Sequence, residues 1–137
     1  MLFVIVSIQT ERTPSADRDS RLRQALRDLR QELALLHRVF VAREPIMRGS
    51  VYELRRKCGK PSCRCASGNE MHACMVISWT VKGRKHLRTI PREQQAELVA
   101  LAQRYQRFRK ARERFIEVHA EMLAIIDKLE AARRKEP

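Results

Sequence analysis

The sequence Cys58-Gly59-Lys60-Pro61-Ser62-Cys63-Arg64-Cys65, followed closely by His72-Ala73-Cys74, contains all four cysteines of the chain. Cysteines that only fill a core usually lie within apolar segments. These four lie together among Gly, Pro, Ser and basic residues, so we expect their sulfur atoms to take part in chemistry. The spacing is C-x4-C-x-C-x6-H-x-C. It offers more candidate ligands than the four that a structural Zn²⁺ site needs.

Three other interpretations of this segment compete with zinc. A disulfide is disfavoured because Cys63 and Cys65 are too close to bridge each other, and nothing indicates an oxidising compartment. An Fe–S cluster of the plant ferredoxin type needs C-x2-C where this chain has C-x-C. Reduced thiols without metal are the simplest alternative, because the spacing matches no standard zinc finger. We therefore predict a structural zinc ion without assigning a finger class.

Two ligand sets remain open. The preferred set spans one turn of the segment: Cys58, Cys63, Cys65 and His72. Gly59 and Pro61 favour it, because they make the turn between the first two cysteines tight. The alternative set replaces Cys58 with Cys74, and it resembles the zinc arrangement of SWIM domains with the last pair reversed. Cys74 also begins an apolar segment, where a small buried cysteine is ordinary.

Three motifs lie in order along the chain: Arg48-Gly49-Ser50-Val51-Tyr52, then Lys57-Cys58-Gly59-Lys60-Pro61-Ser62-Cys63-Arg64-Cys65-Ala66, then His72. Together they resemble an uncharacterised bacterial domain-of-unknown-function family of small basic Cys-Gly-Lys-Pro-x-Cys-x-Cys proteins. The resemblance covers residues 47–130 and implies a strand hairpin and a long helix after the cysteines. It also implies a setting beside transposase or integrase genes, and hence such an enzyme as a partner. Members often have Gly-Pro after the histidine, where this chain has Ala73-Cys74, so the role of Cys74 is open.

The chain is strongly basic, with 29 Lys and Arg against 16 Asp and Glu and a net charge of +13. This excess favours a polyanion as partner. We expect the metal to hold two loops so that their cations contact nucleic-acid phosphates together. The expected binding residues are Arg55, Arg56, Lys57, Lys60, Arg64, Lys82, Arg84, Lys85 and Arg88. A further basic block within residues 104–114 is interpreted as the solvated face of a helix.

Apolar residues at steps of three and four predict two helices, over residues 16–44 and 92–134. Ser15 or Asp17 is expected to cap the first helix, and Pro45 to end it. Pro91 is expected to open the second. The first apolar seam is Leu22, Leu26, Leu29, Leu33, Leu36 and Phe40. The second is Leu98, Leu101, Tyr105, Phe108, Ala111, Phe115, Val118, Met122, Ile125 and Leu129.

Residues 46–91 are predicted to form a Cys-rich β module of about three strands. The strands are expected at residues 50–56, 74–81 and 85–90, with Lys82-Gly83-Arg84 as the turn of a hairpin. The predicted fold is therefore α+β: an N-terminal helix, a zinc-stapled antiparallel module and a long C-terminal helix. We expect the two helices to pair as an antiparallel coiled coil.

The two apolar seams differ in length. At the rise of a helix, Leu22 to Phe40 spans about 27 Å and Leu98 to Leu129 about 46 Å. About 19 Å of apolar stripe is then left uncovered, which is unusual for a soluble monomer. We therefore expect a homodimer in which the long helices pair across a two-fold axis.

Residues 1–15 are predicted to be an arm outside the domain. Residues 1–8 are apolar but shorter than the roughly 20 residues that span a bilayer, and they lack signal-peptide features. They are interpreted either as an edge strand or as the product of a misplaced start codon, in which case residues 1–10 are not native. We expect a cytoplasmic bacterial protein with no membrane association.

Catalytic motifs are lacking in the sequence, which has no Gly-rich phosphate loop, nucleophile elbow or carboxylate constellation. We therefore expect no enzymatic activity. The preferred function is nucleic-acid binding by an accessory factor of mobile elements. The alternative is a helical scaffold or oligomerisation subunit with a structural zinc ion, in which the charge only maintains solubility.

Overall fold

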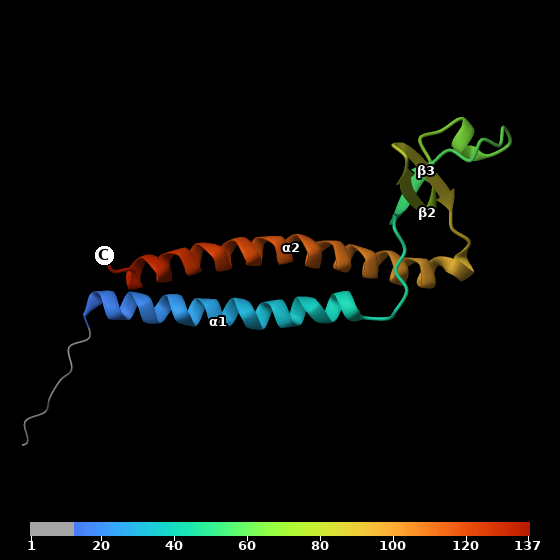
Figure 1. Ribbon diagram of the computed structural model, residues 1–137. Helices are drawn as coiled ribbons and strands as arrows, with labels where there is room; N and C mark the ends of the chain where they lie inside the picture. The colour runs from blue at the N-terminus through green and yellow to red at the C-terminus, as the bar shows by residue number, and fades with distance from the viewer. Residues whose placement is uncertain (1–12) are drawn as a thin grey trace, which may run out of the picture. The chain divides into compact units, whose positions relative to one another are not determined.

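Apolar steps of three and four give the chain two α-helices, and three strands lie between them, of which the middle one is rich in β-branched residues. The computed structural model describes residues 13–137 (Figure 1). The helices are α1 (Pro14–Val41) and α2 (Gln95–Arg133), and the strands are β1 (Ser50–Arg56), β2 (His72–Val81) and β3 (Arg84–Thr89). Two short 3₁₀ helices, η1 (Arg64–Ala66) and η2 (Arg92–Gln94), precede β2 and α2 respectively. The predicted α+β class is confirmed.

The ends of α1 differ from the prediction. The helix begins at Pro14, because proline fits the first helical position, where its missing N–H is no loss. The first helical bond runs from the Asp17 N–H to the Thr13 carbonyl at 3.2 Å, so Ser15 and Asp17 lie inside the helix and do not cap it. The helix ends at Val41, earlier than residue 44. The predictions for residues 1–10 lie outside the described residues.

The described chain forms two compact units, and each is taken by itself. The β unit is Val39–Ala111, and the helical unit combines residues 13–38 with Arg112–Pro137. In the β unit the strand order is β1-β2-β3, all antiparallel. Lys82 and Gly83 both have positive φ, 50° and 77°, and they make the two-residue turn of the β2–β3 hairpin. Such turns suit the twist of antiparallel strands, and glycine adopts them without strain.

The core of the β unit lies between the sheet and the first turns of α2. Ile77, Ile90 and Leu98 are buried, and partly buried residues pack around them: Met47, Val51, Met75, Trp79 and Leu101. The Met47 N–H also donates to the Leu101 carbonyl at 3.2 Å, which ties the segment before β1 to α2. Gly49 has φ +155°, and a Cβ there would lie 3.1 Å from the Ser78 carbonyl oxygen. The start of β1 therefore requires glycine at this position.

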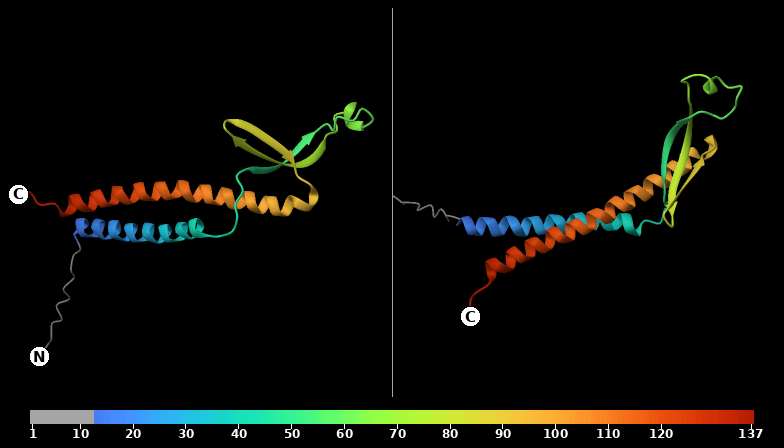
Figure 2. Two further views of the ribbon diagram at one scale, coloured as in Figure 1. Left: turned by 45° about the vertical axis from the view of Figure 1, so that its right-hand side comes forward. Right: turned by 90° about the horizontal axis from the view of Figure 1, so that it is seen from above.

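The helical unit pairs α1 with the C-terminal part of α2, and the two segments run antiparallel (Figures 1 and 2). Leu29 and Val118, one from each predicted seam, are buried. A second apolar stripe on α2 is exposed, with Ile116 57%, Leu123 60% and Ile126 45% accessible. The helices are thus paired within this unit, while their supercoiling as a coiled coil stays a prediction.

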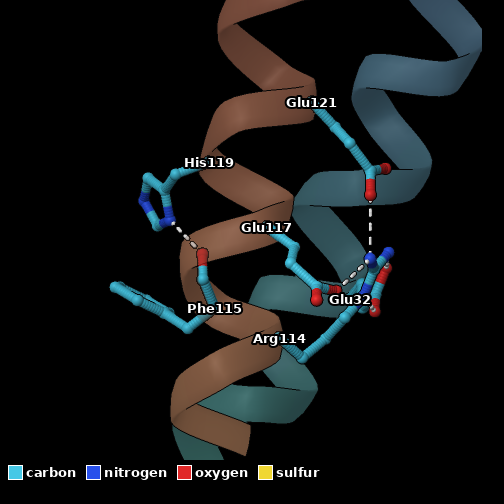
Figure 3. A network of polar contacts seen from close by, with 6 residues as sticks. All are labelled: Glu32, Arg114, Phe115, Glu117, His119 and Glu121. Atoms are coloured by element: carbon cyan, nitrogen blue, oxygen red, sulfur yellow. Dashed lines mark hydrogen bonds and ion pairs between the residues drawn. The ribbon is translucent and has the colours of Figure 1, made fainter.

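Arg114 links the two helices of this unit (Figure 3). Its Nε donates to Glu32 Oε1 at 2.6 Å and its Nη2 to Glu32 Oε2 at 3.0 Å. The same guanidinium contacts Glu121 at 2.8 Å and Glu117 at 3.1 Å. These hydrogen bonds from Arg114 lower the pKa of Glu32 below its ordinary value. The interpretation of this arginine as part of a solvated face is therefore wrong.

Candidate metal centre and basic surfaces

The candidate ligands lie in the loop between β1 and β2, residues 57–71, which we call the knuckle, and at the start of β2. The pairing of Arg56 with His72 closes the base of the knuckle. Gly59 has φ +80°, a conformation that other residues adopt only with strain. The Cys63 N–H donates to the Lys60 carbonyl at 3.1 Å, and this turn leads into η1. Local backbone geometry therefore folds the cysteines back toward β2.

The four residues of the preferred ligand set come together: Cys58, Cys63, Cys65 and His72, whose ligand atoms all lie within 4.8 Å of one another. Cys58 Sγ and Cys65 Sγ are 3.4 Å apart, and Cys63 Sγ is 3.0 Å from His72 Nε2. Zinc bonds of about 2.3 Å to sulfur and 2.0 Å to nitrogen place tetrahedral ligands roughly 3.5–3.8 Å apart. The observed spacing therefore fits one ion after small side-chain movements.

The four ligands differ in exposure and in proton affinity. Cys65 is 2% exposed, while Cys58 and His72 lie at the surface. A hydrogen bond from the Lys60 backbone and another from the Cys65 thiol lower the pKa of Cys58. The Cys58 N–H lowers the pKa of Cys65, but burial and the neighbouring thiols outweigh this effect and raise it. Of these two thiols, Cys58 is thus the one whose thiolate form the surroundings favour, and the thiolate is the form that binds metal.

Cys74 is not a member of this cluster. It lies half-buried on β2, opposite Leu54 of β1. Its position agrees with the expectation of a cysteine within an apolar strand. The structure therefore supports the preferred ligand set over the set that includes Cys74.

The predicted nucleic-acid-binding residues are spread along the sheet from the knuckle to the hairpin turn, so the metal holds together only those near the knuckle. Strand β2 begins beside the knuckle and ends at the hairpin turn after 10 residues. At about 3.3 Å per residue its ends are roughly 30 Å apart. Figure 2 shows the knuckle and the hairpin turn at opposite ends of the sheet. The knuckle surface has Arg55, Arg56, Lys57, Lys60 and Arg64, and the hairpin surface has Lys82, Arg84, Lys85 and Arg88.

Most of these cations have no acidic neighbour. Residues 46–91 contain ten Lys and Arg but only two Asp and Glu, Glu53 and Glu70. Arg55 pairs with Glu53 at 3.2 Å, and Arg56 donates to Thr89 Oγ1 at 3.3 Å. Within residues 13–137, no ion pair or side-chain hydrogen bond is found for the other seven: Lys57, Lys60, Arg64, Lys82, Arg84, Lys85 and Arg88. Their charges are therefore available to an external anion.

A pocket of about 460 Å³ in the β unit was not predicted from the sequence. Its lining combines Arg48, Lys85 and Arg109 with the aromatic residues Trp79 and Tyr105. These residues come from the segment before β1, from both hairpin strands and from α2. No local pattern in the sequence signals that they meet, because only the packing of α2 on the sheet brings them together.

Comparisons with known proteins place the chain by family only. The family model of a domain of unknown function, DUF6788, matches residues 19–100. The search of curated proteins and the search of solved structures each gave no match. Among the helices of residues 13–137, none has the length and apolar character that a membrane crossing requires.

Proposed function

The chain belongs to the DUF6788 family of unknown function, and we propose that it is a zinc-stapled protein that binds nucleic acid through its basic β unit. The bacterial setting beside transposase or integrase genes, which the resemblance implies, makes such an enzyme the proposed protein partner. The proposal has two parts, a structural metal and a polyanion surface, and each rests on its own observation.

The metal part rests on the donor set. Three cysteines and one histidine are the ligands that tetrahedral structural zinc prefers. Four protein ligands leave no open position, so the ion would hold the knuckle together and would not activate a water molecule. Three thiolates and a neutral imidazole around Zn²⁺ carry a net negative charge. Lys57, Lys60 and Arg64 lie on the same knuckle, and their charges stabilise that anionic centre.

The nucleic-acid part rests on one observation, the unpaired cations of the hairpin surface. The metal centre offers no electrostatic reason for Lys82, Arg84 and Lys85, because the knuckle lies at the other end of β2. Arg88 lies between the two ends, opposite Ile77. Arginine and lysine held on a rigid hairpin without acidic partners are suited to phosphate contacts. In the helical unit, acidic side chains hold Arg21, Arg114 and Arg134. The exposed Arg18, Arg23 and Arg30 of α1 have no ion pair with any described residue and provide the comparison below. The hairpin surface is therefore the preferred binding surface.

The test measures binding of a fluorescently labelled duplex and of a labelled single strand over a series of salt concentrations. Three triple variants remove the same charge: Arg84, Lys85 and Arg88 to Gln; Lys57, Lys60 and Arg64 to Gln; and Arg18, Arg23 and Arg30 to Gln. The first triple is expected to weaken duplex binding and to make the salt slope shallower by about 0.9 for each cation that no longer neutralises a phosphate. The third triple lies on exposed positions of α1 and serves as the control.

If the hairpin and α1 triple variants weaken binding equally and only slightly, the hairpin is not the binding surface. A net charge of +13 attracts polyanions without any specific site. A larger effect of the knuckle triple would move the surface to the metal centre. Circular dichroism of each variant shows whether the fold is kept, so that a loss of binding is not confused with unfolding.

A second candidate function, a helical scaffold, is favoured by the exposed stripe Ile116, Leu123 and Ile126. Three large apolar side chains on one helical segment are typical of a surface that another protein covers. The scaffold function predicts that replacing Leu123 and Ile126 by Gln abolishes assembly. It also predicts that none of the three charge triples changes the behaviour of the protein.

A further inference from the structure

The pocket beside the hairpin combines positive charge with aromatic surface. Arg48, Lys85 and Arg109 line it from three separate segments, and no Asp or Glu is among the lining residues. Arginine and lysine side chains that line one hollow attract an anion to it. Hydroxyl and amide groups, those of Ser50, Thr80 and Gln106, complete the lining. The pocket is therefore suited to an anion with further hydrogen-bonding groups.

The aromatic residues narrow the class of ligand. Trp79 and Tyr105 are both half-buried and both line the pocket. Trp79 also stacks on His86, with ring centroids 5.4 Å apart and an interplanar angle of 16°. A ring whose position is fixed by a neighbour is suited to stacking on an aromatic base. The volume of about 460 Å³ lies in the range of pockets that hold one small molecule.

We propose that this pocket holds one unpaired nucleotide of a single-stranded nucleic acid, with its phosphate on the cations and its base against Trp79 and Tyr105. The inference rests on the proposed nucleic-acid binding and specifies the form that is bound. A base in a duplex is paired and stacked, and it reaches such a pocket only after it leaves the helix. Aromatic platforms beside a basic groove are typical of proteins that bind single strands.

A second hollow continues the binding path. It has a volume of about 620 Å³ and shares Gly49, Ser50 and Gln106 with the first. Arg107 and Lys110 of α2 line it, again without an acidic residue. The phosphates next to the bound nucleotide would lie on these two cations. The interpretation of the basic block of α2 as a merely solvated face is therefore replaced, in this part, by a second group of phosphate contacts.

Trp79 gives a direct measurement, because it is the only tryptophan of the chain and it lines the pocket. The full-length protein is titrated with short oligothymidylate, with the matching duplex, with thymidine monophosphate and with inorganic phosphate. Saturable quenching by the single strand is expected, and weaker quenching by the mononucleotide, which lacks the neighbouring phosphates. The duplex is expected to bind the hairpin surface without quenching Trp79 to the same extent.

Arg48→Gln is the decisive variant, because Arg48 lies in the pocket and outside the knuckle and the hairpin. It is expected to weaken single-strand binding about fivefold, the upper range for one exposed ion pair. It should also reduce the single-strand salt slope by about 0.7, the share of one phosphate contact. Duplex binding should be unchanged. Arg43→Gln, which changes an exposed arginine before β1 that does not line the pocket, is the control for the removal of one charge.

The outcomes separate the two proposals. If neither form of nucleic acid binds above the level of the charge controls, the proposed function itself fails. If the single strand binds without quenching Trp79, or if Arg48→Gln weakens both forms equally, the pocket proposal fails while the proposed function survives. Quenching by inorganic phosphate alone to the same extent would also overturn it, because the base would then play no part.

Discussion

The knuckle is the part of the molecule whose folding depends most on metal, and replacing Cys63 with Ser tests this dependence. Within residues 57–71 only Cys65 is buried, so the loop has no apolar core of its own. Burial of one small side chain contributes about 1 kcal/mol, whereas a structural zinc ion contributes about 10–16 kcal/mol in zinc-finger peptides. Loss of even about 3 kcal/mol of local stability raises the population of the open loop roughly a hundredfold.

Trypsin detects this opening, because the knuckle contains Lys57 and Arg64, and Lys60 is protected by Pro61 after it. We expect Cys63→Ser to be cleaved after Lys57 and Arg64 about a hundredfold faster than the unchanged protein. The helical far-ultraviolet signal should be kept, because α1 and α2 have buried residues of their own. Cys74→Ser, which removes a half-buried cysteine outside the cluster, is the matched control. Equal cleavage rates of the two variants would refute the assignment of the ligands.

Three further predictions concern packing, electrostatics and assembly. Ile77→Ala should lower the free energy of unfolding of the β unit by about 2–5 kcal/mol in chemical denaturation, because Ile77 is 3% exposed in its core. Leu87→Ala, which changes an exposed residue of β3, is the control and should lower this free energy far less. Arg114→Gln should raise the pKa of Glu32 toward 4.5 in an NMR titration. Because the folded pKa of Glu32 is depressed, its contribution to stability is present above pH 4.5 and is lost as the pH falls through the folded pKa. The Arg114→Gln variant should lose this pH dependence of the free energy of unfolding. Light scattering should give the mass of a homodimer, and a monomer after Leu123 and Ile126 are changed to Gln; a monomeric unchanged protein would contradict the expected dimer.

The elements and the metal cluster were predictable because their signals are local. Each of these patterns determines the conformation of only a few neighbouring residues. The patterns are the apolar steps of the two helices, the β-branched residues before Val81 and the turn-forming Gly59. The same locality explains the ligand set, since Cys58, Cys63, Cys65 and His72 lie in one loop and at its base.

Long-range relations were not predictable in this way. The ion pair of Glu32 with Arg114 joins residues 82 positions apart, and the pocket joins Arg48 with Arg109. Neither pair can be recognised from a periodic pattern in the sequence, because both depend on how the helices and the sheet pack. The distance between the knuckle and the hairpin turn is a different case. The strand was predicted at residues 74–81 and is observed at His72–Val81, and an extended strand of either length keeps its ends apart.

Metal content is the most direct test of the central claim that Cys58, Cys63, Cys65 and His72 hold a structural zinc ion. Protein purified without chelators is analysed by mass spectrometry for zinc and iron in the same sample. The ligand set predicts about one zinc ion per chain, retained in Cys74→Ser and absent from Cys63→Ser. A chain that contains no metal after growth in zinc-supplied medium would contradict the claim, and so would iron with visible absorption in place of zinc.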